Sequence, residues 1–490
     1  MSGQCGKRKA IVWGALLLAA AMASARVVCE VGNGLPAARI EPRGNYAVAV
    51  SQATLARPEW RRVVEALKDK YAADVVVFSE GRPREALPEL KRLFPAYVCF
   101  VGTPSECGRA FVVAVSRLTR QLDDDPYGDV LWGILTGYTA EDALRAAREA
   151  SPLVIRSGAT SIGVDRLNRL ESGFASNEGC VNDFWTKAPG ATTAVRRAAS
   201  PDAAGALAEA FNARGPDVFY TSGHATEHDW QIAYNLPGGA FRCEAGALFA
   251  QSTDGRRYPI ETPNAKVYLP VGNCLIGHIV APDCMATAWM HSGGARQMIG
   301  YTVVTFYGYM GWGTGLLFED GRLSLAESFF LNNQALLHRL ATRFPQLMDA
   351  RPESYEGQDI AALSERFAKG NGDALGLLWD RDTVAFYGDP AWVASYPCRE
   401  PTFGYRLEES DGAWTLRVTV LKPGGGADPK WGTRPFLALL PERLTDIRDV
   451  VGEGADQPVV TERFVLVPLA RQESEGATAT VTFKAKSVHR

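Results

Sequence analysis

From about residue 45, short apolar segments alternate with longer segments in which apolar positions recur with helical spacing. The apolar segments 46–51, 74–79, 96–102 and 129–137 have the length and β-branched content of buried strands. Thr139 is expected to cap the helix that follows the last of them, because Glu141 and Asp142 fall in its first turn. This alternation predicts an α/β fold with a mostly parallel sheet covered by helices on both faces.

The alternation is interrupted once and then resumes. Residues 157–203 are rich in Gly, Ser, Asn and Ala, and we expect little regular structure there. The next predicted strands, 216–224 and 265–274, end at His224 and Cys274. A helix with Asp283 as its N-cap, a strand over 295–306 and a long helix over 324–344 are expected to follow.

After about residue 396 the helical spacing disappears. Short strands separated by Gly, Pro and Asp predict an all-β sandwich of immunoglobulin-like architecture. The chain therefore divides into a signal segment at 1–25, an N-terminal α/β subdomain at 26–155, a second α/β subdomain at 156–395 and a β-sandwich at 396–490.

The N-terminus has the three parts of a secretory signal. Lys7, Arg8 and Lys9 precede the apolar segment 11–22, and Ala23–Ala25 provides small residues for cleavage. The apolar segment is shorter than the roughly 20 residues of a spanning helix, which favours cleavage over an uncleaved anchor. We expect an exported protein (secreted, periplasmic or on the cell surface) with no stable membrane span after cleavage.

Charge and cysteine content narrow the function further. The net charge is −3 and no long basic run occurs, so nucleic acid is not an expected partner. Nine cysteines in 490 residues are too few for a scaffold built from disulfides, so burial must supply the core. An uncharged run at 298–318 is long enough to span a bilayer, but its glycines and polar aromatic residues favour a buried strand followed by a Gly-rich loop.

His224 and Cys274 are the two reactive side chains at predicted strand ends. Sites in open α/β sheets collect at the carboxyl ends of the strands. A thiol beside an imidazole is a sufficient nucleophile and base for acyl transfer, and the interval of 50 residues is near that of caspases. The spacing alone is equally compatible with a structural thiol and an unreactive loop histidine.

The segment "YTSGHATEHDW" (220–230) also contains H-x-x-E-H, formed by His224, Glu227 and His228. In zinc hydrolases this motif lies on a helix, where positions i and i+4 share one face. Here it follows a strand and shows no helical period, so a zinc hydrolase is a minor alternative and we expect no metal at these residues.

Several separated motifs, in order, resemble the gingipain-like cysteine peptidases, which are relatives of caspases and clostripain. "YTSGHATEHDW" is similar to their His segment, and "VYLPVGNCLIGHIVAPDCMATAWM" (267–290) to their nucleophile segment. "YMGWG" places Trp312 where the family has a Trp beside its specificity pocket, and "VAFYGDPAW" (384–392) is similar to the segment that closes its catalytic domain. The resemblance covers about 127–490 and implies a caspase-like, three-layer catalytic subdomain over 156–395.

The resemblance implies a role for each matching residue. Cys274 would be the nucleophile, His224 the general base and then acid, and the backbone N–H groups of Ala225 and Cys274 the oxyanion hole. An orienting carboxylate is expected upstream of the histidine, either Asp165 or Glu178. Trp312, Glu227 and Trp230 would line the substrate pocket. The implied activity is that of a secreted cysteine endopeptidase acting on polypeptides.

Two departures from the family pattern leave an inactive binding protein as the alternative. The family usually has Gly where this chain has Ala225, and a small residue where it has Asn273. Cys284, at a predicted helix start, is a rival nucleophile. No soluble cofactor is expected, although the acidic cluster Asp123, Asp124, Asp125 and Asp129 is a candidate for structural Ca²⁺.

Overall fold

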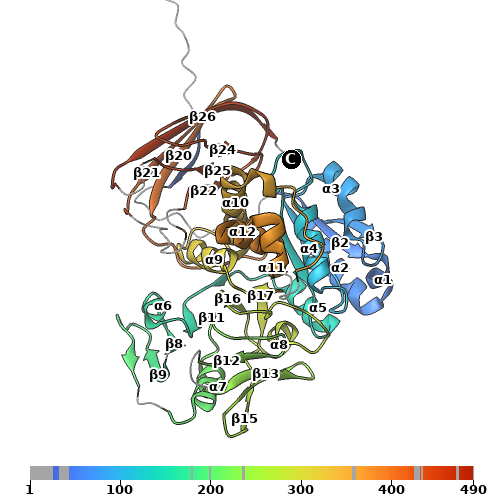
Figure 1. The fold of residues 1–490 in the computed structure, drawn as a ribbon, viewed down its shortest axis with the longest axis vertical. Coiled ribbons are helices and arrows are strands. Elements are labelled where there is room, and N and C mark those ends of the chain that lie inside the picture. Colours follow the sequence, from blue (N-terminus) through green and yellow to red (C-terminus); the bar gives the residue numbers. More distant parts are fainter. Residues whose placement is uncertain are drawn as a thin grey trace, which may run out of the picture.

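The computed structural model describes residues 26–31, 44–177, 180–197, 200–233, 238–355, 360–423, 431, 434–470 and 474–488. Among these residues, twelve strands form one mixed, mostly parallel sheet in the order β10-β9-β8-β7-β11-β16-β17-β18-β5-β4-β2-β3. The fold is therefore α/β with additional antiparallel sheets, as the sequence predicts in outline. Figure 1 shows the two halves of the α/β part and the sandwich (red) beside them.

The N-terminal half of the sheet matches the predicted alternation closely. Its strands are β2 (Tyr46–Ser51), β3 (Asp74–Phe78), β4 (Tyr97–Val101) and β5 (Leu131–Leu135). Its helices are α1 (Gln52–Ala56), α2 (Pro58–Tyr71), α3 (Leu87–Leu93), α4 (Arg109–Leu118) and α5 (Ala140–Arg148), joined by a 3-10 turn, η1 (Pro83–Ala86). Thr139 caps α5 as predicted, and its N–H donates to the Asp142 carboxylate at 2.8 Å.

The second half adds seven strands to the same sheet: β7 (Ser157–Thr160), β8 (Ser172–Asn177), β9 (Cys180–Lys187), β10 (Val195–Arg196), β11 (Val218–Thr221), β16 (Lys266–Pro270) and β17 (Ala295–Tyr301). Its helices are α6 (Val164–Asn168), α7 (Ala203–Arg214), α8 (Met285–His291), α9 (Tyr309–Glu319), α10 (Leu325–Arg343), α11 (Ile360–Leu363) and α12 (Gly372–Thr383). Short 3-10 and π-helical turns occur at Pro345–Leu347 and Ser364–Ala368.

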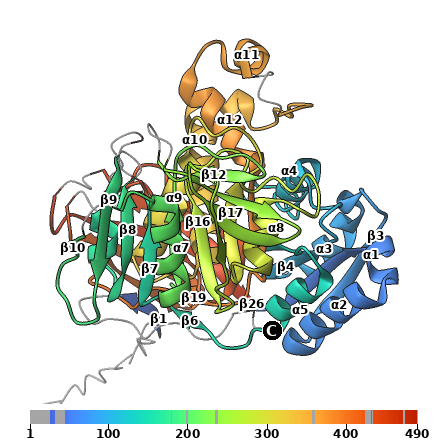
Figure 2. The ribbon, with the colours of Figure 1, turned by 90° about the horizontal axis from the view of Figure 1, so that it is seen from below.

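Helices cover both faces of this sheet, so the hydrophobic core has two parts, one on each face. Apolar residues of α2, α5, α9, α10 and α12 pack on one face, and those of α3, α4, α7 and α8 on the other. Along β2, Val48 faces the first cluster while Ala47 and Ala49 face the second, as strand alternation requires. Figure 2 shows β7, β16 and β17 with α7 and α8 in front of them.

The segment 157–203 is more regular than its composition suggested. It contains β7, β8, β9, β10 and α6, and β7 pairs with β8 and β11 in parallel. The small residues of this segment allow neighbouring strands to approach closely, and they do not mark loops. A Cβ at Gly173 would lie 1.9 Å from the carbonyl oxygen of Gly158 on the neighbouring strand.

The apolar run 298–318 also differs from the prediction. The expected strand is present as β17, but the expected Gly-rich loop contains α9. Two glycines of this helix face close neighbours: a Cβ would lie 2.0 Å from the carbonyl oxygen of Val271 at Gly311 and 2.2 Å from Asn332 Oδ1 at Gly313. Within the described residues, no helix has both the length and the apolar character needed to cross a membrane.

The strand β18 (Val384–Gly388) joins the two halves, because it lies between β17 and β5. Asp389, directly after it, is buried and accepts hydrogen bonds from the phenols of Tyr46 (2.9 Å) and Tyr71 (2.6 Å). Lys70 Nζ lies 3.1 Å from the same carboxylate. The Gly-Asp-Pro segment thus has a structural role, since its carboxylate ties β18 to β2 and α2.

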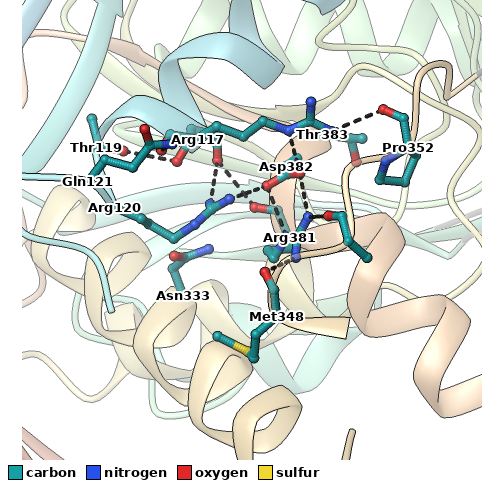
Figure 3. Close-up of polar contacts among 12 residues, drawn as sticks. Arg117, Thr119, Arg120, Gln121, Asn333, Met348, Pro352, Arg381, Asp382 and Thr383 are labelled. Atoms are coloured by element: carbon teal, nitrogen blue, oxygen red, sulfur yellow. Dashed lines mark hydrogen bonds and ion pairs between the residues drawn. The ribbon is translucent and has the colours of Figure 1, made fainter. Parts of the chain in front are cut away.

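A second buried carboxylate, Asp382, fixes α12 against α4. It lies within 3.1 Å of guanidinium nitrogens of Arg117, Arg120 and Arg381, and Figure 3 shows the three side chains around it. The positive charges hold the pKa of Asp382 well below its usual range, although burial opposes them. Arg381 also donates to backbone carbonyl groups of the segment that follows α10.

The C-terminal region is a β-sandwich. One sheet has the order β1-β20-β21-β26-β23 and the other the order β22-β25-β24, with an apolar core that includes Trp414, Phe436 and Phe483. The strands are β1 (Arg26–Val31), β20 (Phe403–Ser410), β21 (Ala413–Val420), β22 (Phe436–Leu439), β23 (Arg443–Glu453), β24 (Val459–Val460), β25 (Phe464–Val467) and β26 (Thr478–Val488). The strand β1 pairs with β20, so residues 26–31 belong to this sandwich and not to the neighbouring α/β sheet.

Two small sheets complete the described elements. The first has the order β12-β13-β14-β15, formed by β12 (Asp229–Gln231), β13 (Ala240–Glu244), β14 (Ala247–Gln251) and β15 (Arg257–Ile260). The second pairs β6 (Leu153–Val154) with β19 (Ala394–Ser395). The predicted signal segment 1–25 lies outside the described residues.

Candidate active site

Parallel strands β11 and β16 bring the two candidate catalytic residues to one edge of the sheet. Thr221 pairs with Pro270 at the carboxyl ends of these strands. His224 follows in the loop after β11, and Cys274 in the loop after β16. His224 is exposed and Cys274 is half-buried, so both lie at the surface where a substrate has access.

Asn273 joins these two loops through its side chain. It is fully buried, and its Oδ1 accepts a hydrogen bond from the Thr221 hydroxyl at 2.7 Å. Its Nδ2 donates to the carbonyl oxygen of Gly223 at 3.0 Å. Asn273, the residue before Cys274, is therefore hydrogen-bonded to Gly223, the residue before His224. Because its side chain is buried, Asn273 supports both loops from the protein interior and does not crowd the site.

The sulfur of Cys274 faces the loop after β17. The Thr305 N–H donates to Cys274 Sγ at 3.3 Å, and the Thr305 hydroxyl donates to the carbonyl oxygen of Asn273 at 3.1 Å. A hydrogen bond from an amide is stronger to a thiolate than to a neutral thiol. Thr305 was not among the residues singled out from the sequence, because it acts through its backbone from a loop with no motif.

The backbone turns sharply directly after Cys274. Leu275 has φ of 57°, in the left-handed region that branched side chains rarely adopt. Such strain is typical of residues beside catalytic groups. The Leu275 N–H donates to the carbonyl oxygen of Val303 at 3.0 Å, whereas the Cys274 N–H makes no hydrogen bond with a described residue.

Ala225 fits the His loop without strain. The left-handed residue of this turn is Gly223 (φ 95°), and Ala225 does not have a positive φ. Ala225 forms a bridge with Trp230 in which the amides of Thr226 and Gln231 donate, at 2.9 Å each. In such a pair the Ala225 N–H points away from the bridge, which is compatible with its expected role as an oxyanion donor.

Trp230 does not line an open pocket. Its side chain is fully buried, and its indole N–H donates to the carbonyl oxygen of Ser222 at 2.9 Å. It packs edge-on against Phe219 and Phe241. Trp230 therefore supports the His loop from the core side, which explains why the motif contains a Trp here. Its assignment to the substrate pocket is corrected accordingly.

Glu227 also acts between the loops. Its Oε1 lies 3.0 Å from Nδ1 of His278, four residues after Cys274, and its carbonyl oxygen accepts from the Met285 N–H at 2.7 Å. Arg109 Nη2 lies 3.2 Å from the same imidazole nitrogen. The Glu227–His278 pair links the His segment to the nucleophile segment. His278 was not predicted from the sequence to belong to the site.

Trp312 lies beside the ends of β11 and β16, close to Gly272 and Ser222. A Cβ at Gly272 would lie 3.4 Å from the Trp312 indole nitrogen and 2.6 Å from the Ser222 hydroxyl, so a larger residue there would displace the Ser222 hydroxyl. The Arg166 guanidinium lies 5.5 Å from the Trp312 ring.

The nearby carboxylate of Glu319 is already engaged by two cations. Arg166 Nε and Arg169 Nη1 each lie 2.9 Å from one of its oxygens. The charge of Glu319 is therefore balanced by arginines of the same fold.

The structure does not decide which of the two predicted carboxylates orients His224. Asp165 is exposed on α6, and Glu178 lies outside the described residues. The identity of the acid beside His224 stays a prediction.

Cys284 is poorly suited to be the nucleophile. It is fully buried, and burial raises the pKa of its thiol. It occupies the N-cap position of α8, where Asp283 was expected, and the Asp283 carboxylate instead accepts from the amides of Ala245 and Gly246. Cys284 is free, as are the other cysteines whose side chains are described, Cys29, Cys99, Cys107, Cys243, Cys274 and Cys398.

The H-x-x-E-H motif does not form a converging set of ligands in the described part of the chain. The segment 224–228 is a turn followed by β12, and Glu227 faces His278. The group of three potential metal ligands found among the described residues is instead Asp123, Asp125 and Asp129, far from this motif in the sequence.

Comparisons with known proteins add little to this geometry. No family model matches the chain, and no curated protein matches it. A solved structure described as "Structure of Protease" is similar over 91% of this chain and 97% of its own, with 10% sequence identity and a TM-score of 0.37. At this level two chains need not share a fold or an activity, so the functional argument rests on the site itself.

Proposed function

We propose that the chain is a cysteine endopeptidase in which Cys274 is the nucleophile and His224 the general base. The observation that carries this proposal is the double hydrogen bond of Asn273, which holds the Cys loop and the His loop together at adjacent strand ends. Reactive groups held by buried, satisfied side chains are preorganised for catalysis.

In the proposed reaction, His224 accepts the thiol proton as Cys274 Sγ attacks the carbonyl carbon of the scissile peptide bond. The oxyanion accepts hydrogen bonds from the amides of Ala225 and Cys274. The C–N bond then breaks, and the amine leaves with the proton carried by His224. Water, deprotonated by His224, hydrolyses the thioester and restores the thiol.

The surface beside Cys274 suits an extended polypeptide. Val304 and Phe306, which flank Thr305, are 38% and 39% exposed. Large apolar side chains that stay exposed around a polar centre are typical of a binding surface. We infer that apolar side chains of the substrate contact these two residues on either side of the reacting bond.

The test is cleavage of an unbiased peptide library by the purified chain and its variants. Cys274→Ala and His224→Asn are expected to lower kcat/KM by at least about 1,000-fold, because the thiol and the base act as one unit. His228→Asn is the matched control, since His228 is exposed in the same loop and has no proposed role. Cleavage that survives Cys274→Ala would show that the proposal is wrong.

The alternative, an inactive binding protein, rested on Ala225 and Asn273. The first adopts an ordinary backbone conformation and the second is hydrogen-bonded within the fold, so neither favours loss of activity. Labelling with a peptidyl acyloxymethyl ketone separates the two functions. An active enzyme is modified at Cys274 in a His224-dependent manner, whereas a binding protein is not.

A further inference from the structure

The start of α4 packs against the loop that follows Cys274. Arg109 is the first residue of this helix, and a Cβ at the preceding Gly108 would lie 3.3 Å from the carbonyl oxygen of Ile279. The helix belongs to the N-terminal half of the sheet, whereas the other residues described at the candidate site belong to the second half. Arg109 therefore brings a side chain of the first half to the candidate site.

The Arg109 guanidinium contacts two loops beside the Cys274 sulfur. Its Nε donates to the carbonyl oxygen of Thr302 at 2.7 Å, in the loop after β17. Its Nη2 lies 3.2 Å from Nδ1 of His278, four residues after Cys274. Thr302 is three residues before Thr305, whose amide donates to Cys274 Sγ. Arg109 therefore contacts both the loop that carries the sulfur and the loop that donates to it.

A third loop is reached through the His278 ring, whose Nδ1 lies 3.0 Å from Oε1 of Glu227 in the His loop. One ring nitrogen cannot donate to a carboxylate and accept from a guanidinium at the same time. The Glu227 side chain is only 20% exposed and its carboxylate needs a donor, so the Nδ1–H tautomer of His278 fits this geometry. The Arg109 guanidinium then adds positive charge beside the pair and keeps its bond to Thr302.

The helix α4 is itself anchored at its other end. Arg117 and Arg120 bind the buried Asp382 carboxylate of α12 (Figure 3). The helix α12 in turn holds the loop after β17, because the Trp379 indole N–H donates to the carbonyl oxygen of Val304 at 2.9 Å. Groups supported by rigid, buried elements position a site more precisely than groups on unsupported loops.

We propose that Arg109 is a positioning residue of the candidate active site, and that the N-terminal half is thereby part of this site. Arg109 fixes the loop after β17, the Cys loop and the His loop relative to one another. It so sets the approach of His224 and of the Thr305 amide to the Cys274 sulfur. Arg109 touches no reacting atom, and its substitution therefore affects the chemical step more than substrate binding. This inference rests on the proposed peptidase function.

The first test is cleavage of the peptide library by the purified full chain. Arg109→Met is expected to lower kcat by about 10–100-fold with little change in KM, because misplaced reacting groups slow the chemical step. His278→Leu should have a similar effect, whereas His278→Asn should recover most of kcat, since its amide can donate to Glu227 from near the place of Nδ1. Arg148→Met is the matched control, because Arg148 is exposed on α5 in the same half and has no proposed role.

The double variant Arg109→Met/His278→Leu tests whether the two residues act as one unit. It is expected to lose no more than about 3-fold in kcat beyond the more impaired single variant. Urea unfolding checks that every variant is folded under the assay conditions. Three outcomes would overturn the proposal: full kcat in Arg109→Met, equal impairment of His278→Asn and His278→Leu, or a double variant in which the two losses multiply.

Alkylation of Cys274 by iodoacetamide is the second measurement and needs no substrate. Arg109→Met is expected to slow it about 3–10-fold, because the Thr305 amide no longer stabilises the thiolate. If alkylation depends on Arg109 but the unmodified chain cleaves no peptide, the positioning role stands and the proposed peptidase function does not. If the chain cleaves peptides and neither kcat nor alkylation depends on Arg109, the proposed function stands and this inference is wrong.

Discussion

At the scale of single residues, burial separates Cys274 from three other cysteines of the chain. Cys99, Cys107 and Cys284 are fully buried, and burial is the first cause that raises the pKa of each thiol. Cys274 is half-buried and receives an amide hydrogen bond from Thr305. Reactivity toward electrophiles follows thiolate character and access, so Cys274 is expected to react faster than these three buried thiols.

We therefore expect iodoacetamide to alkylate Cys274 in the native chain before these three buried thiols. The measurement is peptide mass mapping after brief treatment at about pH 7.5, with a denatured sample to show that every thiol can react. Faster native labelling of Cys284 than of Cys274 would restore Cys284 as the candidate nucleophile.

Asn273 offers a second residue-scale prediction. Asn273→Ala removes both bonds between the loops and leaves the Gly223 carbonyl group buried without its donor, at a cost of about 1–3 kcal/mol in the free energy of unfolding. Because the loops carry Cys274 and His224, kcat is expected to fall by about 10–100-fold with little change in KM. Urea unfolding and library cleavage measure the two effects; an Asn273→Ala variant with full kcat would show that the bridge does not position the site.

At the scale of elements, β16 carries the nucleophile loop and begins with a buried cation. Lys266 is fully buried, and its Nζ donates to the carbonyl oxygens of Thr262 (2.5 Å) and Asn264 (2.9 Å). Burial, followed by the charge of Arg296, lowers the pKa of Lys266 to about 7. The stability of β16, which leads into the Cys274 loop, is therefore expected to depend on pH near neutrality.

A pKa lowered on folding means that the unfolded chain binds the proton more tightly. The free energy of unfolding should then rise with pH between about 7 and the unfolded pKa of about 10.4, by up to about 1.4 kcal/mol per pH unit. Lys266→Met removes this dependence. Urea unfolding of both chains at several pH values isolates it, and parallel pH profiles for the two chains would contradict the assignment.

The sequence predicted elements well where a strand or helix is defined by its own apolar pattern. The strands β2 to β5 and the helix α10 are of this kind, because both faces of the sheet are buried and α10 lies in the core. Prediction failed at 157–203 and at α9, where glycines serve close contact between segments distant in sequence. No local pattern contains such information.

The same distinction holds for the candidate site. His224 and Cys274 could be singled out from the sequence because strand ends and motifs are local features, and the structure places both after adjacent parallel strands. Thr305 and His278 were missed because one contributes a backbone amide and the other a contact with Glu227, 51 positions away. Trp230 was misassigned because a motif shows that a residue is needed and not whether it faces substrate or core.

At the scale of the whole molecule, Asp389 connects the N-terminal half of the sheet to the strand that joins both halves. Asp389→Ala would remove the acceptor of the Tyr46 and Tyr71 phenols and the anionic partner of Lys70, whose amine would keep only the carbonyl oxygens of Ala147 and Glu149. We expect a loss of about 3–5 kcal/mol in the free energy of unfolding. Glu400→Ala is the control, because the Glu400–Lys422 ion pair is exposed and its removal should change stability by less than about 1 kcal/mol. Equal effects of the two substitutions in urea unfolding would refute this role for Asp389.

The pairing of β1 with β20 has a consequence for the order in which the chain folds. The edge strand β1 lies at residues 26–31, and its partner β20 at 403–410 is synthesised only after the whole α/β part. During synthesis β1 therefore stays unpaired with β20 while the intervening α/β part is made and begins to fold. The five-stranded sheet is complete only when β1 has paired with strands that follow the α/β part in the sequence, so its completion reports that the α/β part has been made.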